Sequence, residues 1–181
     1  MKRAAWLLLP LTLAACGQQD VKTPQDYDLS GTISGDWGTA PRLRLSVVGV
    51  GLPNLIKKDD NQPQNVVRSA SGWTFGLDLP RTPDLAGVYQ VIAYDDANNS
   101  GSYDVGETFA RNRVWLIYSV RGGETPAVTV PAGLPWSGEE AVPALTVQQG
   151  WNVYDRNSPL SAGNPYAGPP TLKVTGYTLS R

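Results

Sequence analysis

Apolar and polar positions alternate with a period of two in several short stretches of the chain, as expected for strands with one buried face. The clearest are residues 42–47 and residues 73–79, and the second stretch is followed by Pro80. Residues 88–94 and residues 114–120 are almost continuously apolar, which is typical of central strands covered on both faces. Weaker strands are expected at residues 29–34, 66–70, 127–130, 144–148 and 172–179.

No stretch shows a convincing amphipathic-helix pattern. The 19 glycines and 15 prolines interrupt any run longer than a couple of helical turns. Short strands separated by Gly, Pro, Asn and Asp predict an all-β fold. We expect an antiparallel Ig-like or transthyretin-like β-sandwich of about seven to nine strands, with little or no helix after the N-terminal segment. A closed barrel is the alternative that the pattern leaves open.

The N-terminal segment has the features of an export signal. Two basic residues, Lys2 and Arg3, precede an uncharged stretch, residues 4–15, that ends at Cys16. Its twelve residues are too few to span a hydrocarbon core of about 30 Å, which needs about 20 helical residues. Residues 1–15 are therefore predicted to be a cleaved signal peptide and not a permanent anchor.

Residues 13–16, Leu-Ala-Ala-Cys, resemble the recognition site of bacterial lipoprotein signal peptidase. The resemblance implies that Cys16 becomes the first residue and carries two or three acyl chains, which are enough for stable attachment to a membrane. An ordinary secretory signal with a chance cysteine is the alternative. Gly17 follows Cys16 where aspartate would signal retention, so resemblance to the enterobacterial sorting rule implies the outer membrane rather than the inner one.

The rest of the chain divides into a polar tether, residues 16–28, and a single domain, residues 29–181. Without Lys2 and Arg3, the 15 basic residues become 13 against 16 acidic ones, a formal charge of about −3 that gives no basis for a nucleic-acid partner. Histidine is absent and Cys16 is the only cysteine. Neither a disulfide, histidine-based catalysis nor a zinc site is therefore expected.

One segment between the two most apolar strands carries a specific chemical pattern. Residues 96–107 match the twelve-residue EF-hand calcium loop. Gly101 stands at position 6, where the loop turns sharply, and Glu107 at position 12 would bind the cation through both carboxylate oxygens. The candidate ligands at positions 1, 3, 5, 7, 9 and 12 are Asp96, Asn98, Ser100, the backbone carbonyl of Ser102, Asp104 and Glu107.

Strands, not helices, are expected on both sides of this loop, so it is predicted to be a structural calcium site in a β-hairpin. Oxygen ligands suit the hard Ca²⁺ ion, and the carboxylates of Asp96, Asp104 and Glu107 would repel one another without a cation. A solvated acidic turn is the alternative, because Asp, Asn, Ser and Gly are also common turn residues.

Residues 86–107, in which a Gly-x-Tyr strand leads into the acidic loop, resemble a segment of transthyretin-like and carboxypeptidase-regulatory-like sandwich domains. They are also similar to calcium-binding B-type repeats of bacterial surface adhesins. The similarity covers about residues 73–120. It implies an extracellular β-sandwich that calcium stiffens, with a structural or adhesive use and no catalysis.

The sequence therefore favours a lipid-anchored, calcium-stabilised β-sandwich that is not an enzyme and that acts as a structural, binding or assembly module at the cell envelope. Its expected partners are the membrane and an envelope protein or polysaccharide. A carbohydrate- or peptide-binding module is the alternative, with Trp136 and Tyr166 as candidate exposed contacts. The tryptophans at positions 73, 115 and 151 are expected in the core. A small envelope hydrolase with paired carboxylates is a third hypothesis, which no motif supports.

Overall fold

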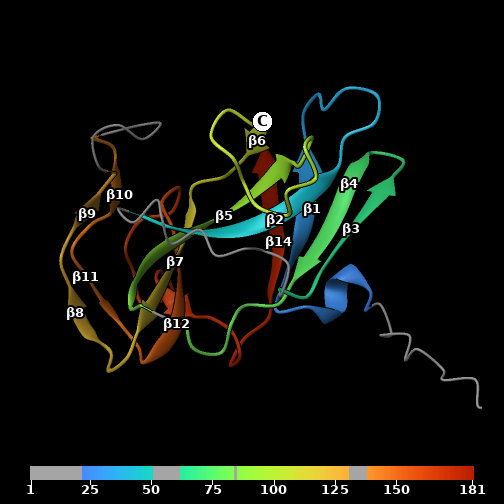
Figure 1. Cartoon of the computed structure of the whole chain (residues 1–181). Helices are drawn as coiled ribbons and strands as arrows, with labels where there is room; N and C mark the ends of the chain where they lie inside the picture. Colours follow the sequence, from blue (N-terminus) through green and yellow to red (C-terminus); the bar gives the residue numbers. More distant parts are fainter. Residues whose placement is uncertain (1–21, 51–61, 84, 131–137) are drawn as a thin grey trace, which may run out of the picture.

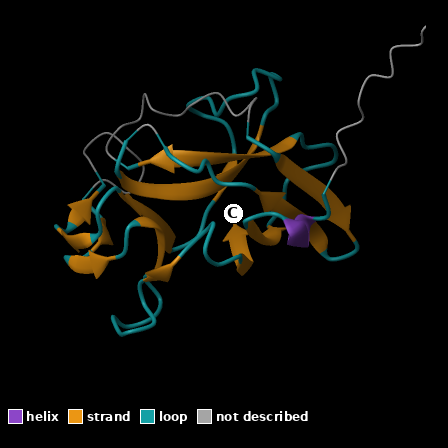
Figure 2. Cartoon of the chain, turned by 90° about the horizontal axis from the view of Figure 1, so that it is seen from below, coloured by secondary structure: helices purple, strands orange, loops and turns teal. Residues whose placement is uncertain are grey.

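The computed structural model describes residues 22–50, 62–83, 85–130 and 138–181. In these ranges the only helix is a 3-10 turn, η1 (Pro24–Asp26), and the other regular elements are strands (Figure 2), which confirms the all-β prediction. No helix in the same ranges is long and apolar enough to cross a membrane. The predicted lipidation site, Cys16, and the candidate contact Trp136 lie outside the described residues.

Two sheets form the body of a β-sandwich (Figure 1). The first has the order β14-β1-β4-β3 and consists of β14 (Val174–Ser180), β1 (Leu29–Ser34), β4 (Gly72–Leu77) and β3 (Gln64–Ser69). The second has the order β13-β12-β7-β5-β2, with β6 paired to β5. Its strands are β13 (Tyr166–Ala167), β12 (Gly150–Asp155), β7 (Val114–Ser119), β5 (Gly87–Asp95), β2 (Leu43–Gly49) and β6 (Phe109–Ala110).

The main core is made of apolar side chains from both sheets. Alternate residues of a strand point to opposite faces, so each strand contributes every second side chain to this core. Trp151 is buried in it, as predicted, and Trp73 packs against it while remaining half-buried. The buried members are Leu29, Ile33, Trp37, Leu45, Phe75, Leu77, Leu79, Val91, Ala93, Ala110, Leu116, Trp151, Val153, Val174, Tyr177 and Leu179.

A second core lies on the other face of the six-stranded sheet, because Trp115 and Ile117 belong to it while their neighbour Leu116 belongs to the main core. It is covered by two small sheets, β9 (Val128–Thr129) with β10 (Glu140–Val142) and β8 (Gly123–Thr125) with β11 (Leu145–Val147), seen beside β7 and β12 in Figure 1. Strands β5 and β7 are therefore covered on both faces, as their apolar sequences predicted. The buried members are Val88, Trp115, Ile117, Val130, Ala141, Val142, Leu145, Val147 and Tyr154.

The described residues contain fourteen strands, more than the seven to nine expected. Several are only two or three residues long, too short for a period of two to be recognised in the sequence. Pro126 separates β8 from β9 and Pro143 separates β10 from β11, because a proline cannot donate a ladder hydrogen bond. The strand pairs are antiparallel as predicted, with the exception of β1 and β14, which run parallel.

The end of the predicted tether is docked against the first sheet. The Lys22 ammonium lies 2.7 Å from a carboxylate oxygen of Asp78. Tyr27 is 4% exposed, and its ring covers Gly76, where a Cβ atom would lie 2.3 Å from the ring. Residues 22–28 are therefore in contact with the first sheet through Lys22 and Tyr27.

Candidate calcium loop

The loop of residues 96–108 connects β5 to β6 and projects from the end of β5 (Figure 1). The two strands form the predicted hairpin, with Tyr94 opposite Phe109. Two backbone bonds hold the base of the loop: the N–H of Asp95 donates to the carbonyl of Thr108 at 3.0 Å, and the N–H of Asp96 donates to the carbonyl of Arg42 at 3.0 Å. The first bond closes the loop just before β6, and the second joins it to the residue just before β2.

Asp96, at position 1, organises the first turn of the loop. It is 1% exposed, and its carboxylate accepts the backbone N–H groups of Ser100 at 2.8 Å and Gly101 at 3.1 Å. Asn99 and Gly101 have positive φ values of 58° and 78°, the left-handed conformation that so tight a turn needs. Gly101 therefore has the conformational role that the sequence predicted for position 6.

The polar side chains at positions 3, 5 and 9 are in contact with one another. The Nδ2 of Asn98 donates to Oδ2 of Asp104 at 2.8 Å. The Oγ of Ser100 lies 2.9 Å from the same carboxylate oxygen and 2.9 Å from the carbonyl of Ser102, and donates its proton to one of them at a time. The bonds from Asn98 and Ser100 hold the pKa of Asp104 below its ordinary value. The structure thus brings four of the six predicted ligands together.

Glu107, at position 12, has one satisfied and one unsatisfied carboxylate oxygen. Its Oε2 accepts the backbone N–H of Asp104 at 3.0 Å. Its Oε1 is buried and has no hydrogen-bond partner among the described residues. A buried acceptor without a donor costs about 1–3 kcal/mol, and more when it is charged. Position 12 therefore holds a carboxylate oxygen that a cation would satisfy.

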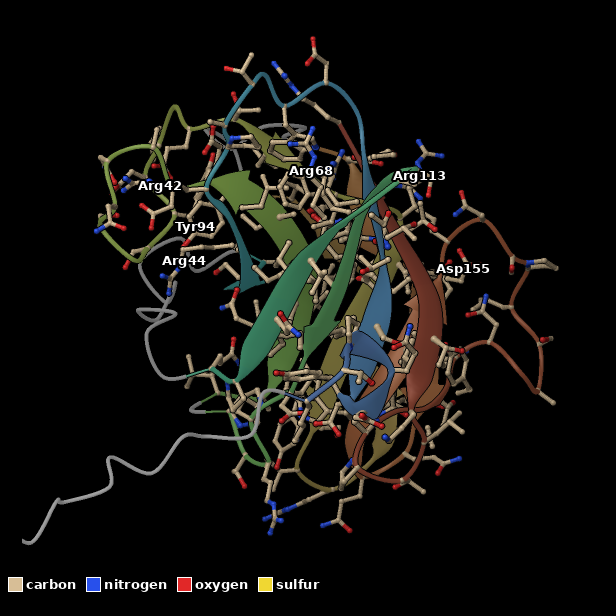
Figure 3. All side chains as sticks on the ribbon, turned by 90° about the vertical axis from the view of Figure 1, so that its right-hand side faces the viewer. Arg42, Arg44, Arg68, Tyr94, Arg113 and Asp155 are labelled. Atoms are coloured by element: carbon tan, nitrogen blue, oxygen red, sulfur yellow. The ribbon has the colours of Figure 1, made fainter. Side chains whose placement is uncertain are left out.

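Arg44 is a neighbour of the loop that the sequence did not reveal. Its Nε lies 3.9 Å from Oδ2 of Asp96, and its side chain is 32% exposed. Figure 3 shows Arg44 with Arg42 and Tyr94 on the side of the sheet from which the loop projects. Arg44 offsets part of the charge of Asp96, so the loop keeps the negative charges of Asp104 and Glu107. Only the register of β2 on β5, which sets Arg44 opposite Tyr94, could have indicated this contact.

Tyr103, at position 8, attaches the loop to the sheet. Its ring makes edge contacts with Tyr94 and Phe109, with ring centroids 5.7 Å and 5.6 Å apart. Burial, and to a lesser degree the charge of Glu107, raise the pKa of the Tyr103 hydroxyl. The loop is therefore anchored by an aromatic cluster at its middle as well as by backbone bonds at its base.

The three carboxylates of the predicted site do not form a compact group. In the part of the chain that the structure describes, no three His, Cys, Asp or Glu side chains lie together in an arrangement that could hold a metal ion. Asp96 accepts bonds from amides of its own turn, whereas Glu107 bonds to the amide of Asp104. The oxygens available on the loop are carboxylate, amide, hydroxyl and carbonyl oxygens, a set that suits a hard cation such as Ca²⁺.

Tyr166, expected to be an exposed ligand contact, is half-buried. It lies in β13 opposite Val153, and its ring packs against the main core. Burial, and to a lesser degree the charge of Asp155, raise the pKa of its hydroxyl. Part of the Tyr166 side chain is therefore used for packing on the main core, and its role as a ligand contact stays a prediction.

Comparison with protein-family models, with curated proteins and with solved structures finds no match to this chain. Inferences about function accordingly depend on the geometry of residues 96–107 and on the sequence of the N-terminal segment.

Proposed function

We propose that this protein is a lipid-anchored, extracytoplasmic β-sandwich stabilised by calcium, and that it serves as a non-catalytic structural or assembly module of the bacterial cell envelope. The buried, unpaired Oε1 of Glu107 carries the calcium part of the proposal, because it stands at the loop position where a bidentate carboxylate is needed. The lipobox-like residues before Cys16 support the anchor.

The site would be formed by the side chains and the one carbonyl predicted from the sequence. Asn98, Ser100 and Asp104 are already within hydrogen-bond distance of one another, so a cation would bind where these polar atoms converge. Calcium would supply positive charge between Asp104 and Glu107 and satisfy Oε1 of Glu107, which has no hydrogen-bond donor among the described residues. Because the loop connects the central strand β5 to β6 and β7, fixing it would stabilise the core of the six-stranded sheet.

An envelope role agrees with the composition of the chain. Histidine, the commonest general base, is absent from the sequence, which weakens the case for a hydrolase. The acyl chains on Cys16 would hold the domain at the membrane surface, with the outer membrane favoured. The partner would be another envelope protein or a polysaccharide.

Calcium should raise the melting temperature of the purified full chain in a saturable way. Binding at 100 times the dissociation constant adds about 2.7 kcal/mol, which for a domain of this size corresponds to roughly 5–10 °C. Extracellular calcium modules bind at about 10⁻⁴ to 10⁻³ M, so we expect the change in the millimolar range. Thermal melts in EDTA and across a calcium series measure the effect, and magnesium should be weaker because it dehydrates reluctantly.

The Glu107→Gln variant separates this site from general salt effects. It should lose the saturable calcium shift, and without calcium it should be at least as stable as the wild type, because the unpaired buried charge is gone. Glu124→Gln, which removes an exposed carboxylate in β8, is the matched control and should keep the full shift. A calcium response that survives in Glu107→Gln would show that the loop is only an acidic turn.

Cys16 should carry the lipid. We expect intact-mass spectrometry of the protein isolated from bacterial membranes to show loss of residues 1–15 and addition of at least two acyl chains. The Cys16→Ala variant should be released from the membrane fraction. Recovery of unmodified Cys16 in a secreted, soluble chain would support the ordinary secretory signal instead.

A further inference from the structure

Strand β3 lies at one edge of the four-stranded sheet (Figure 1), and β4 is its partner in that sheet. The N–H of Asp78 donates to the carbonyl of Pro63 at 3.0 Å, just before β3 begins. Hydrogen-bonded pairs recur at every second residue of an antiparallel ladder, so the odd-numbered residues of β3 bond to β4. The backbone N–H and C=O groups of Gln64, Val66 and Arg68 therefore point away from β4.

This edge of β3 is open to a further strand. Within the part of the chain that the structure describes, no group bonds to the outward backbone of Val66 or Arg68. The register of β3 on β4 has no bulge, and the strand contains no proline. Its one charged residue, Arg68, holds its guanidinium over the Trp73 ring of β4, 5.7 Å from the centroid. Unpaired N–H and C=O groups along such an edge are a template for strand pairing.

The middle of β3 is apolar on both faces. Val66 packs against the main core but is only half-buried, and Val67, on the outer face, is 43% exposed. The outer face continues from Val67 as an uncharged row of one threonine per strand: Thr74, Thr32 and Thr178. A second chain can therefore approach this edge and cover apolar surface without burying a charge.

We propose that β3 pairs antiparallel with β3 of a second copy of this chain, about a two-fold axis at Val66. In this register Val66 lies opposite its own counterpart, and Gln64 lies opposite Arg68 at both ends. The three hydrogen-bonded pairs supply about six backbone bonds, two in each pair. An axis at Val67 would keep about four of them. An axis at Arg68 would set two guanidinium groups opposite each other, and like charges in that position are destabilising.

The position of the N-terminal segment agrees with this symmetry. A two-fold axis of this kind is perpendicular to the sheet, so the outer faces of both copies lie on the same side. Tyr27 covers Gly76 on that face, and Nδ2 of Asn65 donates to the carbonyl of Lys22 at 3.0 Å. With the lipid anchor proposed above, both copies would reach one membrane, which raises their effective concentration. The pairing itself depends neither on the anchor nor on calcium.

Sedimentation equilibrium of the purified full chain tests the proposal. A six-residue strand is only about 20 Å long, so we expect a weak dimer. Over concentrations up to about 1 mM, the average mass should rise from 19.4 kDa towards twice that value. A chain that remains monomeric at the highest concentration would overturn the proposal.

Two variants of exposed residues locate the contact. Val67→Lys places two positive charges near the axis and should weaken association about tenfold. Arg68→Pro removes an outward N–H, which an edge strand tolerates, and should weaken association as well because two of the six bonds are lost.

The matched control is Thr32→Lys, which adds the same charge to an exposed position of the outer face in the central strand β1. It should leave association unchanged. Association that persists undiminished in Val67→Lys and Arg68→Pro would overturn the proposal, because the contact would then lie elsewhere on the chain. Equal losses in the two lysine variants would also overturn it, because the effect would then reflect overall charge.

Discussion

The Gly31→Ala variant should lower the free energy of unfolding by about 3 kcal/mol or more, in the upper part of the range for overpacked sites. A Cβ at Gly31 would lie 1.8 Å from the carbonyl oxygen of Tyr177 and 2.8 Å from its backbone nitrogen. These are backbone atoms of β14, so a rotamer change cannot relieve the clash. The parallel pairing of β1 with β14 would have to open, and with it the packing of the buried Tyr177 ring on Phe75. Urea denaturation measures the change.

The control for this prediction is Gly87→Ala at the start of β5. A Cβ at Gly87 would meet no atom within 4 Å, so the change in stability should stay within about 0.5 kcal/mol. A loss below about 1 kcal/mol in Gly31→Ala would contradict the close approach of β14 to β1. Because Gly31 is far from residues 96–107 in the sequence and lies in the other sheet, the variant also tests the fold independently of the calcium loop.

The strands that the sequence predicted are those in which apolar residues either alternate with polar ones or form a continuous run. Residues 29–34 coincide with β1, and the apolar runs 88–94 and 114–120 coincide within a residue with β5 and β7. In each case the apolar pattern of the strand follows from whether one or both of its faces are buried. The partner of each strand depends on residues far away in the chain. The parallel pairing of β1 with β14 could not be predicted for this reason.

Strand β12 was missed because a buried residue in it resembles a turn residue. Asn152 is 1% exposed, and its amide donates to the carbonyl of Gln148 at 2.8 Å and to that of Gly150 at 3.1 Å. Its Oδ1 accepts the N–H of Gln148 at 2.8 Å. The buried Asn152 side chain thus forms hydrogen bonds with backbone groups of the tight connection between β11 and β12. In the sequence, Asn152 interrupts an otherwise apolar run and suggests a loop.

The calcium loop and the arginine cluster around Glu139 differ in how much of each the sequence contains. All six predicted calcium ligands lie within twelve consecutive residues, so their spacing could be recognised without knowledge of the fold. The arginine cluster joins residues that are far apart: Glu139 is 28 positions from Arg111 and 17 from Arg156. The only local signal was Arg-Asn-Arg at residues 111–113, between two apolar strands. That these two arginines lie beside the same carboxylate, Glu139, is determined by the fold and not by the local sequence.

The Trp151→Ala variant should lower the free energy of unfolding by about 3–5 kcal/mol, the range for removing a buried tryptophan. Trp151 is 2% exposed, and its ring makes edge contacts with Tyr89 and Tyr118, at centroid distances of 5.3 Å and 5.2 Å. Its Nε1 donates to the carbonyl of Pro80 at 2.8 Å, which ties the six-stranded sheet to the segment that follows β4. The alanine variant loses the ring, the hydrogen bond and this link, and chemical denaturation measures their combined effect.

Two further variants separate these contributions. Trp151→Phe keeps an aromatic ring and loses the bond to Pro80, so its loss should be about 1–2 kcal/mol. Trp73→Ala removes the same side chain from a half-buried position beside Arg68, so its loss of stability should be smaller than that of Trp151→Ala. Equal losses in the two variants would contradict the burial described for Trp151.

Tyr89, which contacts Trp151, is seven residues or about 23 Å of extended strand from Asp96. Because distant sites act additively, Trp151→Phe should keep the full calcium increment, whereas Glu107→Gln should abolish that increment without loosening the core.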